Sequence, residues 1–233
     1  MLTQIIHWMQ VAGTAFDVAL LARVLLLRLH RTYLFITLAC VVAVLFDGAD
    51  LWLGFGSDAS ARLFFYSRFL CLIVFPLAVW DVFEEIKTRV VQIRRFAIAR
   101  LISGMLFTVL LAFVTSAFYE VDTVVTMGLV LWAGAATASL AFLITMHRVI
   151  RAQALELPRN TSVWMRFYEF SLAGELLGCF AFVLLQLVKS ETVRGSVELA
   201  LTLYGMAITA WCVWKLRRIP SEDIGQAGER AAL

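Results

Sequence analysis

Charged residues are scarce in this chain of 233 residues. Asp, Glu, Lys and Arg make up 16% of it, whereas soluble domains contain about 25%. The hydrophobic fraction is 62% and the mean hydropathy is +0.87. So few charges cannot cover the surface of a soluble domain, which excludes a cytosolic enzyme, a nucleic-acid-binding protein and a secreted disulfide scaffold. The composition predicts an integral membrane protein.

Cysteine and histidine are also few, and they are scattered. The four cysteines lie one to an apolar run, at Cys40, Cys71, Cys179 and Cys212. They form no Cys-x-x-Cys pair, and the three histidines lie near the ends of runs without metal-binding spacing. We therefore expect no disulfide, no metal site and no cofactor such as haem.

Three further absences bear on function. The last apolar run has Tyr204-Gly205-Met206 at its centre, where a retinal protein needs a lysine. A single proline, Pro76, lies well inside a run, whereas inverted-repeat transporters often have helices broken at matching positions in both halves. No nucleophile lies beside a general base in a recognisable pattern, so enzymatic activity is not expected.

Seven long apolar runs account for most of the chain. They cover residues 5–27, 33–53, 63–83, 98–118, 121–146, 163–188 and 197–216. Each is close to the roughly 20 residues that a helix needs to cross a bilayer, and the runs are continuous rather than alternating, which favours helices over strands. Residues 1–219 are thus predicted to form one all-α, seven-transmembrane-helix domain. Residues 220–233 are polar and are predicted to be a short disordered cytoplasmic tail.

The basic residues predict the orientation of the bundle. Connections after the first, third, fifth and seventh runs carry most of the Lys and Arg, whereas the opposite connections carry Arg62, Lys189 and Arg194. By the positive-inside rule the N-terminus lies outside and the C-terminus in the cytoplasm of a multi-pass protein of the cell membrane. The link at residues 119–122 is so short that the fourth and fifth helices should be antiparallel neighbours.

Ionisable residues inside the runs are the best functional candidates, because burying one costs at least about 2.5–3.5 kcal/mol. The candidate ligand- or ion-binding residues are Asp17, Asp47, Asp50, Arg68, Glu175, Glu198 and Tyr204. Asp47 and Asp50 share a helix face, and Arg68 lies at a similar depth on the next run. One interpretation is an internal ion pair between these two runs. The other is an outward-facing polar pocket that binds a cation, an amine or a proton.

Polar and small residues recur at helical spacing on several runs. The last run carries such a stripe at Glu198, Thr202, Gly205, Thr209 and Cys212, and the first carries Gln10, Thr14 and Asp17. These stripes predict a polar interior shared by the first, second, third, sixth and seventh helices. Gly174 and Gly178 form a Gly-x-x-x-Gly motif that favours close helix approach.

The fourth and fifth helices carry no charge in their centres and are expected to be scaffold. Residues 133–138 form a patch of small side chains, typical of tight helix packing or of a dimer face.

These features favour a small-ligand or ion-binding sensor, or an accessory membrane subunit, whose output domain belongs to a protein partner. The alternative is a small-solute or proton-coupled transporter, and an enzyme that acts on lipid has the least support. Membrane lipids are expected partners, a homo-oligomer is compatible with the sequence, and nucleic acid is not expected.

Overall fold

A computed structural model describes residues 2–54, 57–87, 91–118, 123–187 and 190–218. These residues form seven long α-helices and a short 3-10 helix, η1, and contain no strand. The α-helices are α1 (Leu2–Leu26), α2 (Leu34–Leu53), α3 (Asp58–Ile86), α4 (Val91–Phe118), α5 (Thr123–Ala152), α6 (Arg159–Leu187) and α7 (Glu191–Lys215), and η1 is Leu29–Arg31.

Within these residues, seven helices are long and apolar enough to cross a membrane. The predicted all-helical, seven-helix architecture is thereby confirmed. Each helix overlaps one predicted run, and α3, α4, α5, α6 and α7 are longer than predicted because turns with polar residues continue them beyond the apolar segment. The predicted tail (220–233) and the short link (119–122) lie outside the described residues.

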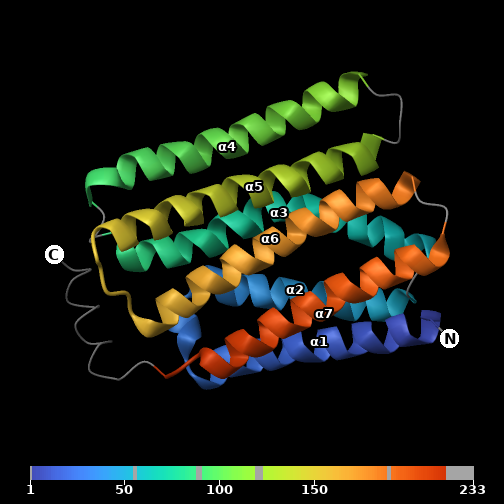
Figure 1. The fold of residues 1–233 in the computed structure, drawn as a ribbon, viewed down its shortest axis with the longest axis horizontal. Coiled ribbons are helices and arrows are strands. Elements are labelled where there is room, and N and C mark those ends of the chain that lie inside the picture. Colours follow the sequence, from blue (N-terminus) through green and yellow to red (C-terminus); the bar gives the residue numbers. More distant parts are fainter. Residues whose placement is uncertain (1, 55–56, 88–90, 119–122, 188–189, 219–233) are drawn as a thin grey trace.

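Six of the helices form a closed ring. Contacts join α1 to α2, α2 to α3, α3 to α5, α5 to α6, α6 to α7, and α7 back to α1, and α3 also touches α6. Among the described residues α4 packs substantially against α5 alone, and Figure 1 shows it at the edge of the molecule. The prediction that the fourth and fifth helices are neighbours is confirmed.

Small side chains make the contact between α4 and α5 close. A Cβ atom built on Gly104 would lie 2.9 Å from the Cβ of Ala138, and one built on Gly134 would overlap the side chain of Thr108. The small-residue patch on α5 therefore serves tight packing against α4.

The apolar core is concentrated in the half of the bundle near the C-terminal end of α7. Its largest fully buried side chains are Trp164, Tyr33, Phe83, Phe142, Leu29, Ile36, Ile86, Leu143, Met146, Met165, Leu172 and Leu216. These residues come from η1, the end of α3, the start of α2, the first half of α6, the later turns of α5 and the residue after α7. Side chains thus fill this half of the ring.

Buried hydrogen bonds tie the same half together. Asp81 of α3, which is 6% exposed, accepts a 2.7 Å hydrogen bond from the backbone N–H of Ile36 in the first turn of α2. Tyr33, the N-cap residue of α2, makes no capping hydrogen bond with its own side chain. The hydroxyls of Tyr33 and Thr161 lie 3.0 Å apart and join the start of α2 to the start of α6. The first bond caps the start of α2, and the second fixes the start of α2 against the start of α6.

Candidate functional site

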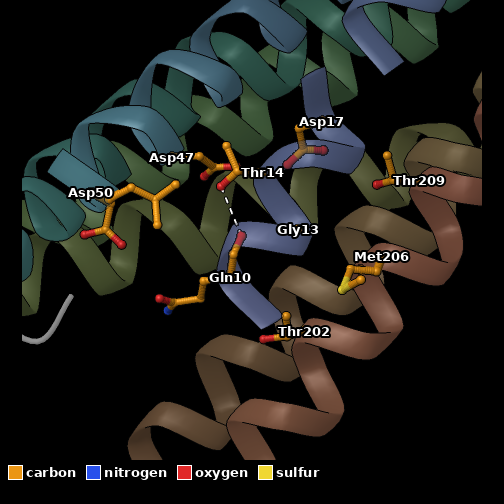
Figure 2. A pocket seen from close by; sticks show the side chains of 11 residues that line it. Gln10, Gly13, Thr14, Asp17, Asp47, Asp50, Thr202, Met206 and Thr209 are labelled. Atoms are coloured by element: carbon orange, nitrogen blue, oxygen red, sulfur yellow. Dashed lines mark hydrogen bonds between the residues drawn. The ribbon is translucent and has the colours of Figure 1, made fainter. Parts of the chain in front are cut away.

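Two adjacent cavities lie in the other half of the ring, toward the end that carries the N-terminus. The smaller, of about 260 Å³, lies between α1, α2 and α7 (Figure 2). The larger, of about 630 Å³, also reaches α3, α5 and α6. Both are partly open, and they share the wall residues Asp17, Asp47, Thr202, Gly205 and Thr209. The polar stripes of α1 and α7 therefore face the same space.

Acidic side chains from two helices meet in the smaller cavity. The carboxyl groups of Asp17 on α1 and Asp47 on α2 lie within hydrogen-bonding reach of each other. Asp50 also lines this cavity, and it accepts a hydrogen bond from the hydroxyl of Ser60 on α3. The structure thus brings together three of the predicted site residues, from two different helices.

The remaining polar groups of this cavity include two hydroxyls whose protons are already engaged. The Thr14 hydroxyl donates to the carbonyl oxygen of Gln10 at 3.1 Å, and the Thr202 hydroxyl donates to that of Glu198 at 2.9 Å. The side-chain Oε1 of Gln10 is buried and has no hydrogen-bond partner. The wall consequently offers hydrogen-bond acceptors.

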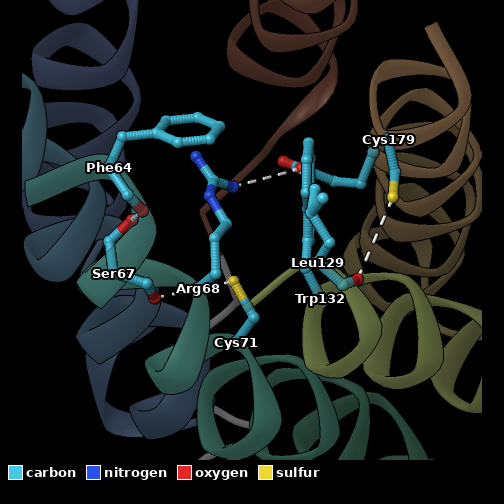
Figure 3. Close-up of polar contacts among 8 residues, drawn as sticks. Phe64, Ser67, Arg68, Cys71, Leu129, Trp132 and Cys179 are labelled. Atoms are coloured by element: carbon cyan, nitrogen blue, oxygen red, sulfur yellow. Dashed lines mark hydrogen bonds and ion pairs between the residues drawn. The ribbon is translucent and has the colours of Figure 1, made fainter. Parts of the chain in front are cut away.

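Arg68 and Glu175 lie on the wall of the larger cavity and face each other. The guanidinium Nη1 is 3.5 Å from the Glu175 Oε2 (Figure 3), and the side chains are 18% and 34% exposed. The guanidinium carbon lies 4.0 Å from the ring centre of Phe64 and 4.4 Å from that of Trp132. The Trp132 Nε1–H donates a 2.7 Å hydrogen bond to the same Glu175 oxygen. A carboxylate and two aromatic faces thus neutralise the Arg68 charge.

Of the two interpretations of these residues, the ion pair between the second and third helices is not formed, although the Arg68 charge acts on Asp47. The structure joins Arg68 to Glu175 on α6, while Asp50 is held by Ser60. The long arginine side chain reaches across the cavity, so depth along neighbouring helices did not identify its partner.

Glu198 lies apart from the two cavities. It lies on α7 one turn before Thr202, yet it is exposed and lines neither cavity. The stripe on α7 therefore faces the cavities from Thr202 onward.

The Gly-x-x-x-Gly motif of α6 accommodates aromatic rings rather than a helix backbone. A Cβ on Gly174 would lie 2.7 Å from Cε1 of Tyr204, and a Cβ on Gly178 would lie 3.7 Å from the Trp132 ring. Tyr204 lines the larger cavity and donates a 3.0 Å hydrogen bond to the carbonyl oxygen of Phe170. Its ring thereby links α7 to α6.

Trp132 and Asp81 were not identified as candidates from the sequence. Trp132 was assigned to scaffold, although a tryptophan well inside a run usually needs an acceptor for its N–H, and this would have indicated a nearby polar group. Asp81 lies close to the end of its run and was not counted among the membrane-embedded acids. Its partner is a backbone N–H on another helix, which leaves no signal in the sequence.

The described residues contain no cluster of metal ligands. No group of three or more His, Cys, Asp or Glu side chains there could hold a metal ion. The chain matches no known protein-family profile, no curated protein and no solved structure. The two cavities and their walls are the features of the described residues that indicate a function.

Proposed function

We propose that this protein binds a small ligand or ion in the two adjacent cavities and acts as a membrane sensor or as an accessory membrane subunit. The observation that carries the proposal is the division of the ring into two unlike halves. One half has two partly open cavities lined by Asp17 and Asp47, and the other is filled by apolar side chains. Such a site admits a ligand at one end of the bundle and stops it at the other.

The proposal includes an orientation and a membrane. Lys and Arg are concentrated on the connections at the packed end of the bundle, and the positive-inside rule places that end in the cytoplasm. In the cell membrane the cavities would then receive ligands from outside. A sensor of this kind passes its signal to a partner protein at the cytoplasmic face.

Transport is the second candidate function, and the contact between Asp17 and Asp47 favours it. A pair of carboxyl groups within hydrogen-bonding reach can hold and release a proton, as membrane-embedded acids of proton-coupled carriers do. A carrier must also open the packed half of the ring, which requires separating side chains such as Phe83 and Phe142, whose rings lie 5.5 Å apart.

The two functions are separated by comparing binding with flux. Small polar and charged compounds are screened for a saturable rise in the unfolding temperature of the protein in lipid nanodiscs, and each hit is then assayed for uptake into proteoliposomes. A ligand at 100 times its Kd stabilises the fold by about 2.7 kcal/mol. We expect stabilisation that Asp47→Asn removes and Glu198→Gln retains, with no uptake.

Uptake that depends on Asp47 would replace the sensor with the transporter. A complete lack of saturable stabilisation across the screen would contradict ligand binding itself.

A further inference from the structure

We infer that the ligand is an organic ammonium ion, an amine with an apolar substituent, whose nitrogen lies against Asp17 and Asp47. This inference rests on the proposed binding function and names the class of ligand. It follows from the charges of the cavity walls, their unused hydrogen-bonding groups and the shape of the space beside them.

The charges of the walls are unbalanced in one place. In the larger cavity the positive charge of Arg68 is matched by Glu175 and by the faces of Phe64 and Trp132. The residues that line the smaller cavity are all described, and they include three acids and no basic side chain. The adjacent carboxyl groups of Asp17 and Asp47 repel each other when both are ionised, so a positive charge between them is stabilising.

The hydrogen-bonding groups point to the same ligand chemistry. The hydroxyls of Thr14 and Thr202 donate within their own helices. The Gln10 Oε1, which is buried in the wall of the smaller cavity, lacks a donor. A buried acceptor without a partner costs about 1–3 kcal/mol. An ammonium group supplies several N–H donors, which the Gln10 Oε1 and the carboxylates of Asp17 and Asp47 can accept.

The space beside the two acids is apolar and aromatic. Asp17 and Asp47 also line the larger cavity, whose wall includes Phe46, Phe75 and Phe167. A volume of about 630 Å³ is within the range of small-molecule sites. A bare metal ion would leave these side chains without contacts, whereas the hydrocarbon part of an amine would cover them. The walls thus favour an organic cation over an inorganic one.

Three compounds of equal length that differ only in the head group provide the test. Hexylammonium, hexanol and hexanoate are each titrated into the protein in lipid nanodiscs, with the unfolding temperature and calorimetric heat as readouts, and sodium chloride is titrated separately. We expect saturable binding of hexylammonium, at least about tenfold tighter than that of hexanol or hexanoate. Titration of each compound into nanodiscs that lack the protein measures its partition into lipid.

Variants locate the binding. Asp47→Asn and Asp17→Asn should each weaken hexylammonium binding by about tenfold or more, whereas Glu198→Gln, which removes an exposed carboxylate of α7, should leave it unchanged. The head-group comparison needs no variant. It therefore tests the preference for an ammonium ion even if Asp47→Asn or Asp17→Asn fails to fold.

Each of three other outcomes would overturn the amine inference, and they differ in what they leave of the proposed function. Equal or tighter binding of hexanol or hexanoate, lost in the Asp47→Asn variant, would overturn the amine inference and leave the proposed binding function standing. Saturable stabilisation by sodium, with none by hexylammonium, would do the same in favour of an inorganic cation. An absence of saturable binding by all four probes would overturn the amine inference, and the proposed function would then depend on the wider screen described above.

Discussion

Arg68 on α3 and Glu175 on α6 form an ion pair of 3.5 Å across the wall of the larger cavity, and Trp132 on α5 donates to the same carboxylate. One carboxylate thereby joins three helices that enclose the cavity. The pair accounts for two of the charged residues that sequence reasoning assigned to ligand binding. It is a brace of the cavity wall, and it leaves Asp17 and Asp47 as the groups available to a ligand.

Removing the charge of Glu175 should destabilise the protein. In Glu175→Gln the amide oxygen still accepts from Trp132, but the Arg68 charge loses its counter-ion. We expect a loss of about 2 kcal/mol in unfolding free energy, between values for exposed and buried pairs, because both side chains are partly exposed. Reversible unfolding in mixed micelles measures it, with Glu198→Gln as the matched control. An equal effect of the two substitutions would refute the brace.

Close packing of α4 on α5 should make Gly134 intolerant of a larger side chain. In Gly134→Ala the added methyl group overlaps Thr108, and overpacking of this kind costs about 1–3 kcal/mol. Gly48→Ala is the control, because a Cβ at Gly48 meets nothing within 4 Å and alanine favours the helix by up to about 1 kcal/mol. Relative to the unaltered protein, the unfolding free energy should fall in Gly134→Ala and rise in Gly48→Ala. Similar changes in both variants would argue against tight α4–α5 contact.

Asp81 should be needed for the first turn of α2. Asp81→Ala leaves the Ile36 N–H buried without its acceptor, at a cost of about 0.5–2 kcal/mol typical of a lost cap. Asp81→Asn keeps an oxygen in place and should cost less. Hydrogen exchange at the Ile36 amide is the decisive readout, since it should accelerate in Asp81→Ala. Unchanged exchange in that variant would show that the cap does not protect the turn.

Tyr33 should make the stability of the protein depend on alkaline pH. Burial raises the pKa of Tyr33 well above its usual value, which is about 10. The unfolded chain therefore releases this proton first, and the stability due to the neutral phenol is present below about pH 10 and lost as the pH rises further. Between pH 8 and pH 11 the free energy of unfolding should fall less in Tyr33→Phe than in the unaltered protein. Tyr66→Phe, at a tyrosine that is 59% exposed, should not reduce the fall.

The number of helices and their approximate positions could be predicted from the sequence. In a bilayer every backbone N–H and C=O must bond within its own segment, so a run of about 20 apolar residues is read as a helix with little ambiguity. Helical periodicity also identified the faces of α1 and α7 that line the cavities, through Thr14, Asp17, Thr202 and Thr209.

The partners of those faces could not be predicted. A periodic pattern identifies which side chains share a face, but it does not identify the helix that lies opposite. An ion pair between Arg68 and the α2 acids was therefore one of two open interpretations, whereas the structure pairs Arg68 with Glu175 on α6. Trp132 was overlooked because its own helix carries no charge in its centre. The exposure of Glu198 depends on where the stripe of α7 leaves the ring, and helix crossing decides this.

Sided chemical labelling at Thr209 tests the central claim, a binding cavity open toward the N-terminal end of the bundle and closed toward the other. Thr209 lines both cavities, although along α7 it lies nearer to Lys215 than to Glu191. In a protein whose native cysteines are replaced by alanine, Thr209→Cys is exposed to a small, membrane-impermeant thiol reagent on each side of sealed proteoliposomes, with an N-terminal epitope marking the sides. We expect labelling only from the N-terminal side, and hexylammonium should slow it. Labelling from the C-terminal side would show that the packed half opens, and it would contradict a one-ended binding site.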